Sequence, residues 1–125
     1  AELGFEFTLE RGPDLKGKTD YMSMIVWRGS DGGSGEEGVN TVSSVPLKTW
    51  FHVAGVYDLA AMSIYLNGRL EATVPTGYAR RISSEPFYIG RRSDPCCTME
   101  GAIDDLRVYN RPLSTDEIRA LYEGT

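Results

Sequence analysis

Apolar and polar residues alternate along several short stretches of this chain. Leu3, Phe5, Phe7 and Leu9 are apolar, and the residues between them are Gly, Glu or Thr. A period of two is typical of a β-strand with one buried face. Similar stretches, separated by Gly, Pro, Asn and Asp, predict strands at residues 21–29, 38–45, 50–57, 86–90 and 102–110. Short strands at regular spacing are typical of an all-β sandwich or barrel, so the pattern predicts an all-β fold.

Asn67-Gly68 gives the strongest local prediction, because both central residues of a type I′ turn need a positive φ and this dipeptide tolerates it. The flanking stretches MSIYL and RLEATV should therefore pair as a hairpin. Alternation places Met62, Ile64 and Leu66 on the core side. It places Leu70, Ala72 and Val74 opposite them on the same side.

One helix is predicted, at the C-terminal end. Ser114 followed by Glu117 forms the pattern of a capping box, in which each residue satisfies a backbone N–H near the start of a helix. The helix is expected from Thr115 to Tyr122 and should end at Gly124. A short terminal helix on a β domain is expected to cover an edge of the sandwich.

Composition limits the classes of function. The chain has 125 residues, which suits a single domain over residues 1–125, and a net charge of −5. This acidity argues against a nucleic-acid partner, because binding to phosphates depends on clustered Lys and Arg. No apolar run approaches the about 20 residues that span a bilayer, so no membrane segment is expected.

The chain begins at Ala1 without a leader, so we interpret it as a mature polypeptide or as the C-terminal part of something larger. Its two cysteines are the neighbours Cys96 and Cys97. Neighbours on an extended chain point to opposite sides, so a vicinal disulfide, an intermolecular link and two free thiols all stay open.

Four motifs occur in one order: WFHVAGVYD at residues 50–58, IYLNG at 64–68, FYIGR at 87–91 and GAIDDLRVYNRPLSTDEIRALY at 101–122. Over about residues 38–124 the chain resembles the laminin-G-like domains of the concanavalin A-like lectin and glucanase superfamily. The resemblance implies a jelly-roll β-sandwich of antiparallel strands that serves outside the cell or at the cell surface, in bacterial proteins. Domains of this kind usually begin with further strands, so we expect an edge that self-association or a complementing chain covers.

Catalysis is not expected. In related laminarinase-type glycoside hydrolases a strand carries Glu-x-Asp-x-Glu, whereas Glu6 and Glu10 here flank Thr8. Residues i and i+4 of a strand lie about 13 Å apart, and retaining hydrolysis needs carboxyl groups about 5 Å apart. His52, the only imidazole, has no nucleophile or carboxylate at a motif-like spacing. We interpret His52 and Trp50 as parts of the sheet.

The resemblance also suggests a structural calcium ion. In related jelly-roll hydrolases an aspartate at the start of the last strand binds calcium, and Asp104 matches that position. Calcium accepts carboxylate and carbonyl oxygens in flexible geometry, so one aspartate with loop carbonyls would suffice. The alternative is that Asp104 accepts a backbone N–H at the start of a strand.

Binding of a sugar needs exposed aromatic rings that stack on pyranose faces. Trp27, Tyr78 and Tyr88 are the candidate platforms. We therefore predict a non-catalytic extracellular module for binding or adhesion, whose partner is a glycan or a surface protein. One alternative is a structural subunit that completes its sandwich with a partner chain, and a weaker one is a glycoside hydrolase that uses Glu6 and Glu10.

Overall fold

The structure is a computed structural model that describes residues 5–10, 20–27, 36–76, 88–91 and 98–124. These residues form strands β1 (Phe5–Glu10), β2 (Tyr21–Trp27), β3 (Glu36–Asn40), β4 (Val53–Tyr57), β5 (Ala61–Leu66) and β6 (Arg69–Pro75), and helix α1 (Thr115–Glu123).

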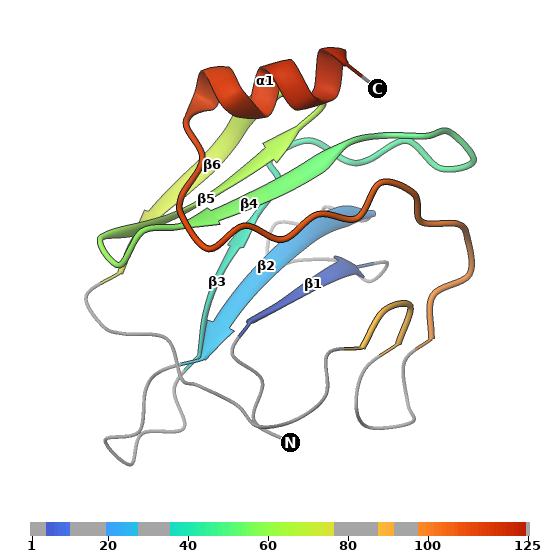
Figure 1. Cartoon of the computed structure of the whole chain (residues 1–125). Coiled ribbons are helices and arrows are strands. Elements are labelled where there is room, and N and C mark those ends of the chain that lie inside the picture. The colour runs from blue at the N-terminus through green and yellow to red at the C-terminus, as the bar shows by residue number, and fades with distance from the viewer. Residues whose placement is uncertain (1–4, 11–19, 28–35, 77–87, 92–97, 125) are drawn as a thin grey trace.

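The described strands form two antiparallel sheets that pack face to face. One sheet has the order β1-β2-β3 and the other the order β4-β5-β6. Figure 1 shows the two sheets as layers, with α1 on the outer side of the second sheet. The predicted all-β sandwich of antiparallel strands with a short C-terminal helix is confirmed.

Apolar side chains from both sheets fill the space between the layers. Met62 and Ile64 of β5 are fully buried, and Met24 of β2 and Val39 of β3, which lie opposite each other in the first sheet, are 5% and 2% exposed. Burial of such side chains is the main stabilising contribution to a sandwich, at about 1.5–3 kcal/mol for each. The remaining buried members of the cluster are Met22, Val45 and Leu66.

Gly55 of β4 faces side chains of the opposite sheet at close range. A Cβ atom at this position would overlap the Phe7 ring and the Met24 sulfur atom of the opposite sheet. Phe7 and Met24 are paired residues of β1 and β2. The glycine within the sequence VAGVY therefore allows β4 to approach the first sheet.

The hairpin of β5 and β6 has the predicted turn but a different register. Asn67 and Gly68 have φ values of 50° and 78°, as a type I′ turn requires. Leu66 pairs with Arg69, and a β-bulge beyond the turn sets Ile64 against Ala72. Leu70 consequently pairs with Tyr65 and is 51% exposed, so its predicted place on the core side is wrong. One extra residue moves a side chain to the other face.

Three other predicted strands differ in extent. The strand expected at 38–45 is β3, which ends at Asn40, and the strand expected at 50–57 is β4, which begins at Val53. Of the strand expected at 86–90, residues 88–90 are described and are not in a strand. Beyond them, Arg91 forms an isolated antiparallel bridge with Thr98.

The strand predicted at residues 102–110 is absent from this described stretch, which has no regular structure. Asp105 has a φ of 53°, and its N–H donates to Oδ1 of Asp104 at 2.8 Å. A left-handed residue interrupts an extended chain, and the aspartate side chain satisfies the N–H that a sheet neighbour would otherwise bind. Among the described residues, no strand therefore pairs with this segment.

Helix α1 confirms the predicted capping box. The Glu117 N–H donates to Ser114 Oγ, and the Ser114 N–H donates to Glu117 Oε1. Ile118 is fully buried, and the Tyr65 hydroxyl of β5 forms a 2.9 Å hydrogen bond with Thr115 Oγ1. The helix is thereby fixed to the outer face of the second sheet. Among the described residues, no helix is long and apolar enough to cross a membrane.

Acid should weaken this helix cap. Hydrogen bonds from Arg111 and from the Ser114 backbone lower the pKa of Glu117 to about 2. Because the folded pKa lies below the ordinary value of 4.5, the contribution of Glu117 to stability is complete above pH 4.5 and is lost as the pH falls towards 2. We expect the difference in Tm between the wild type and Glu117→Gln to shrink over this range in thermal melts. A difference that is constant between pH 6 and pH 2 would contradict the proposed role.

Candidate functional site

The residues of the WFHVAGVYD motif lie at the start of β4, beside the hairpin turn. The His52 N–H donates to Asn67 Oδ1 at 2.9 Å, and the Asn67 N–H donates to the His52 carbonyl at 2.8 Å. These two bonds join residues 15 positions apart and fix the turn against β4. The backbone of His52 therefore serves the fold, as predicted, although His52 itself lies just outside the strand.

The imidazole of His52 is poorly placed for acid–base catalysis. Its Nδ1 atom is buried and has no hydrogen-bond partner among the described residues. Its ring lies tilted against Tyr122 of α1, with 5.9 Å between the ring centroids. Burial, and then the positive charge of Arg107, lower the pKa of His52, so the ring is neutral at pH 7.

Trp50 is the aromatic residue that sequence reasoning placed wrongly. It was expected within the sheet, but it precedes β4 and its side chain is 67% exposed. Leu47, on the same connection, is 45% exposed, and Lys48 between them has a φ of 59°. Pro46 is the sequence signal that indicates this placement, because a proline ends a strand and the residues after it then lie on a connection.

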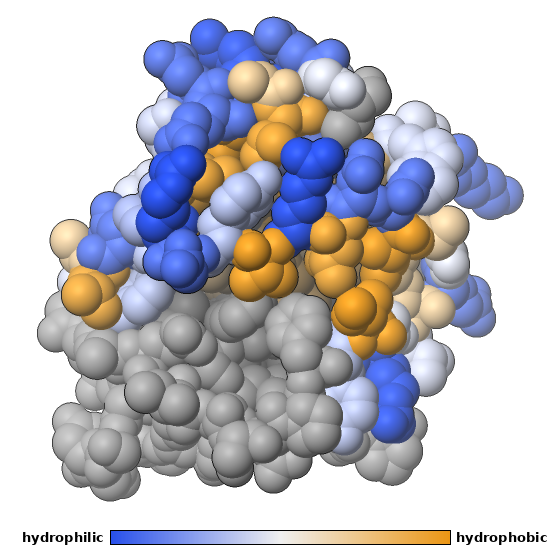
Figure 2. Space-filling view, in the orientation of Figure 1, coloured by the Kyte–Doolittle hydropathy of each residue, from blue (hydrophilic) through white to orange (hydrophobic). Residues whose placement is uncertain are grey.

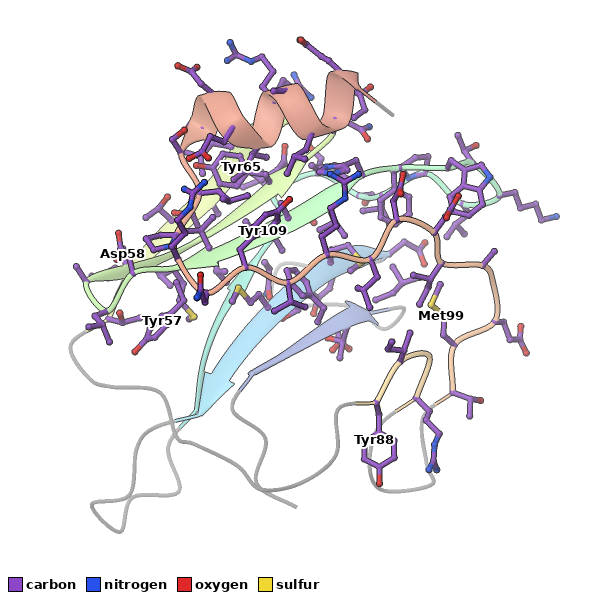
Figure 3. The ribbon with its side chains drawn as sticks, in the orientation of Figure 1. Tyr57, Asp58, Tyr65, Tyr88, Met99 and Tyr109 are labelled. Carbon is purple, nitrogen blue, oxygen red and sulfur yellow. The ribbon has the colours of Figure 1, made fainter. Side chains whose placement is uncertain are left out.

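Of the three aromatic residues predicted to bind a ligand, Tyr88 is the one whose side chain the structure describes. Tyr88 is half-buried, and the Arg91 guanidinium lies 4.7 Å from its ring centroid, which covers one face of the ring. Figure 3 shows Tyr88 well away from Tyr65 and α1. Trp27 ends β2 opposite Glu36, but its side chain is outside the described part, as is the whole of Tyr78. Their ligand-binding roles stay predictions.

Asp104, the predicted calcium ligand, is exposed and accepts the N–H of Asp105 through Oδ1. The alternative prediction, a carboxylate that accepts a backbone N–H, matches this contact, although no strand begins there. In the described residues, Asp104 belongs to no group of three or more His, Cys, Asp or Glu side chains that could hold a metal. Those side chains do not form a complete calcium site around Asp104, and calcium binding stays a prediction.

The pair Glu6 and Glu10 lies on β1, at the edge of its sheet. The Thr8 hydroxyl donates to Glu10 Oε1 at 2.9 Å, so the residue in the place of the family's aspartate is a neutral partner of this carboxylate. The side chain of Glu6 is outside the described part, as are Cys96 and Cys97.

A shallow groove of about 390 Å³ lies between α1 and the chain that leads into it. Its charged residues neutralise each other, because both terminal nitrogens of Arg111 donate to the Glu117 carboxylate, at 3.0 and 2.5 Å. The groove lining consists of Tyr109, Arg111, Leu113, Glu117, Ala120 and Leu121.

A further exposed surface is formed by residues 98–112, all of which are exposed. Several are large and apolar, and Figure 2 shows apolar side chains gathered on this side of the molecule. Leu106 is 52% exposed and Val108 is 67% exposed. Monomeric proteins rarely expose contiguous apolar surface of this kind unless it has a partner. The other large apolar residues of the segment are Met99, Ile103 and Tyr109.

Comparison with known proteins supports the fold and the family. Among curated proteins, none matches the chain. A solved structure, residues 221–444 of an S-layer domain-containing protein from Clostridium thermocellum, is similar with a TM-score of 0.55 and 24% identity. The match covers 83% of this chain and 52% of that one, so the chain spans about half the length of that solved structure. The family model described as "Concanavalin A-like lectin/glucanases superfamily" matches residues 5–119. Since this match takes in both sheets and most of α1, the chain belongs to the concanavalin A-like lectin/glucanases superfamily.

Proposed function

We propose that this chain is a non-catalytic module that works outside the cell, at a bacterial surface or in a secreted protein, and binds carbohydrate or protein. The observation that carries the proposal is the 67% exposure of Trp50 on a connecting segment. Tryptophan is a large apolar residue that proteins usually keep mostly covered, and an exposed one is typical of a contact surface.

The framework residues support a binding role rather than catalysis. His52 of the WFHVAGVYD motif and Asn67 of the IYLNG motif form two hydrogen bonds with each other. The backbone N–H and carbonyl of His52 take part in them, and its imidazole does not. The imidazole that could have acted as a base has its Nδ1 atom buried. With the motif residues used to hold the hairpin, recognition is assigned to the connections, which vary without affecting the sandwich.

Trp50 has suitable neighbours for a ligand. Leu47 contributes apolar surface on the same turn, and Lys48 provides a charged donor between them. An aromatic face stacks on the C–H face of a pyranose, and adjacent donors bind hydroxyl groups. The same combination of Trp and a cation fits a protein surface, so both ligand classes belong to the proposal.

A glycan array probed with the wild-type chain and with Trp50→Ala tests the proposal. We expect bound glycans whose signal falls about tenfold or more in Trp50→Ala, because stacking on the ring is lost, and falls less in Trp50→Phe. Leu59→Ala is the matched control, since Leu59 is 60% exposed on another connection. Binding that survives Trp50→Ala would contradict the assignment to this turn.

A protein ligand is tested in the same way. If the array gives no signal, binding of the chain to intact bacterial surfaces treated to remove glycans should persist and should again depend on Trp50. Hydrolysis of β-glucans by the wild type that is abolished by Glu6→Gln would overturn the non-catalytic assignment and favour the glycoside hydrolase.

A second candidate function, a structural or assembly subunit, is favoured by a separate observation. Residues 98–112 are exposed throughout and include five large apolar side chains that are between 44% and 67% exposed. An apolar segment of this kind suits contact with another polypeptide.

A further inference from the structure

The connection between β3 and β4, residues 41–52, carries Trp50 on a short exposed loop with buried neighbours at both ends. Every residue from 46 to 50 is exposed. Val45, directly before this loop, is 4% exposed and belongs to the core cluster. Phe51, directly after it, is partly buried and packs against the same cluster. The two ends of the exposed loop are therefore fixed by the core.

Hydrogen bonds join the first part of the connection to the chain at the start of β2. Thr41 is fully buried, its N–H donates to the Met22 carbonyl at 2.9 Å, and its Oγ1 accepts the Met22 N–H at 3.1 Å. The Val45 N–H donates to the Asp20 carbonyl at 2.6 Å. These bonds hold the connection against the first sheet.

Glu71 of β6 joins the same part of the connection to the second sheet. Its Oε1 accepts the Ser43 N–H at 2.7 Å, and its Oε2 accepts from Ser43 Oγ at 3.3 Å. The Ser43 carbonyl accepts in turn from Thr41 Oγ1 at 3.0 Å. Hydrogen bonds to a carboxylate are stronger than those between neutral groups. Glu71 thus fixes Ser43 from a strand that lies 28 positions away in the sequence.

Asn67 holds the other end of the connection, two residues after Trp50. Its Oδ1 accepts the His52 N–H at 2.9 Å, and its N–H donates to the His52 carbonyl at 2.8 Å. Asn67 and Glu71 lie four positions apart in the β5–β6 hairpin. One hairpin therefore binds the connection on both sides of the exposed loop.

We propose that Asn67 and Glu71 are positioning residues that preorganise the loop of residues 46–50 and thereby hold Trp50 ready for a ligand. Each acts through a residue of the connection, Asn67 through His52 and Glu71 through Ser43. A loop that already has its bound conformation loses less conformational entropy on binding. This inference rests on the proposed binding at Trp50, but the order of the loop can be measured without any ligand.

Relaxation of ¹⁵N nuclei in the free chain measures the order of the backbone at residues 46–50 and of the Trp50 indole. The indole signal of Trp50 is identified by its loss in Trp50→Phe. We expect order parameters of about 0.85 in the wild type and values that fall towards about 0.6 in Glu71→Ala. Glu71→Gln should keep the wild-type values, because its amide oxygen accepts the Ser43 N–H and its NH₂ group donates to Ser43 Oγ. Unchanged order in Glu71→Ala would overturn the positioning role of Glu71.

Asn67→Gly makes the same test at the other end. Glycine tolerates the positive φ of the turn but removes the acceptor of the His52 N–H, so the order of the Trp50 indole should again fall. Thr73→Val is the matched control, because it breaks the hydrogen bond between the Ser63 and Thr73 hydroxyls of the same hairpin and leaves the connection untouched. Circular dichroism confirms that each variant is folded.

A glycan array probed with the same variants distinguishes this inference from the proposed function. If the wild type binds through Trp50, Glu71→Ala and Asn67→Gly should each lower the signal about three- to tenfold, and Glu71→Gln and Thr73→Val should not. Binding that depends on Trp50 but is unchanged in Glu71→Ala and Asn67→Gly overturns the inference. Equal losses in Glu71→Gln and Glu71→Ala also overturn it, because the charge of Glu71 would then contact the ligand directly. An ordered loop without binding that depends on Trp50 overturns the proposed function instead.

Discussion

Replacing Ile64 with alanine should lower the free energy of unfolding by about 2–5 kcal/mol. Ile64 is fully buried in β5, between the two sheets, and pairs with Gly55 on one side and Ala72 on the other. These small neighbours leave little side-chain volume to move into the vacated space, so a cavity is expected to remain. Urea unfolding followed by circular dichroism measures the change.

Leu70→Ala is the matched control, because it removes the same number of carbon atoms from the adjacent strand. Leu70 is 51% exposed, since the β-bulge places it against Tyr65 rather than on the core side. Its replacement should change the free energy of unfolding by no more than about 0.5 kcal/mol. Equal losses at positions 64 and 70 would mean that β6 follows the unbroken alternation and has no bulge.

Replacing Asn67 with alanine should cost about 2 kcal/mol. Two effects add: alanine is strained at the φ of 50° that the turn imposes, and the His52 N–H loses the Asn67 Oδ1 atom as acceptor. This N–H lies in a partly buried place, where an unsatisfied donor is costly. Thermal or urea unfolding measures the loss.

Asn67→Gly separates the two effects. Glycine adopts a positive φ without strain but provides no side-chain acceptor, so the loss should be intermediate. If the alanine and glycine variants were both as stable as the wild type, the hydrogen bond between the His52 N–H and Asn67 Oδ1 would contribute nothing to stability.

The elements that could be predicted from sequence are those fixed by neighbouring residues. Asn67-Gly68 forms its turn because both residues tolerate a positive φ, whatever surrounds them. Ser114 and Glu117 cap α1 because they lie three residues apart on the same turn. The family resemblance extended these local predictions to the sandwich, which the family match over residues 5–119 supports.

The features that could not be predicted depend on contacts between distant residues. The bulge between Ile64 and Tyr65 inserts one residue into a regular alternation, and no local signal marks it. The alternation at 102–110 is typical of a strand, but a strand needs a neighbour to bind its backbone, and Asp105 in the left-handed region binds to Asp104 instead. An alternating pattern indicates that a segment can form a strand, but it does not identify the strand with which the segment pairs.

The candidate site at Trp50 was not predicted from the sequence, which suggested Trp27, Tyr78 and Tyr88 as platforms. Sequence reasoning gave His52 a role in the fold, which its two hydrogen bonds with Asn67 support, and it assigned recognition to connecting segments, which stays a prediction. It placed Trp50 in the sheet because the residue precedes an apolar alternation, and the structure places it before β4, 67% exposed. Pro46 indicates that a connection follows β3, but the residue at which β4 begins depends on its pairing with β5, which starts at Val53.

The described residues divide into a buried framework and an exposed segment, residues 102–110, that pairs with no strand among them. Amide hydrogen exchange in a dilute, monomeric solution tests this division most directly. We predict slow exchange along β5, whose amides bond to β4 and β6, and fast exchange across residues 102–110. Slow exchange throughout 102–110 in the monomer would contradict the account, because it would show that this segment is a strand of the chain's own sandwich.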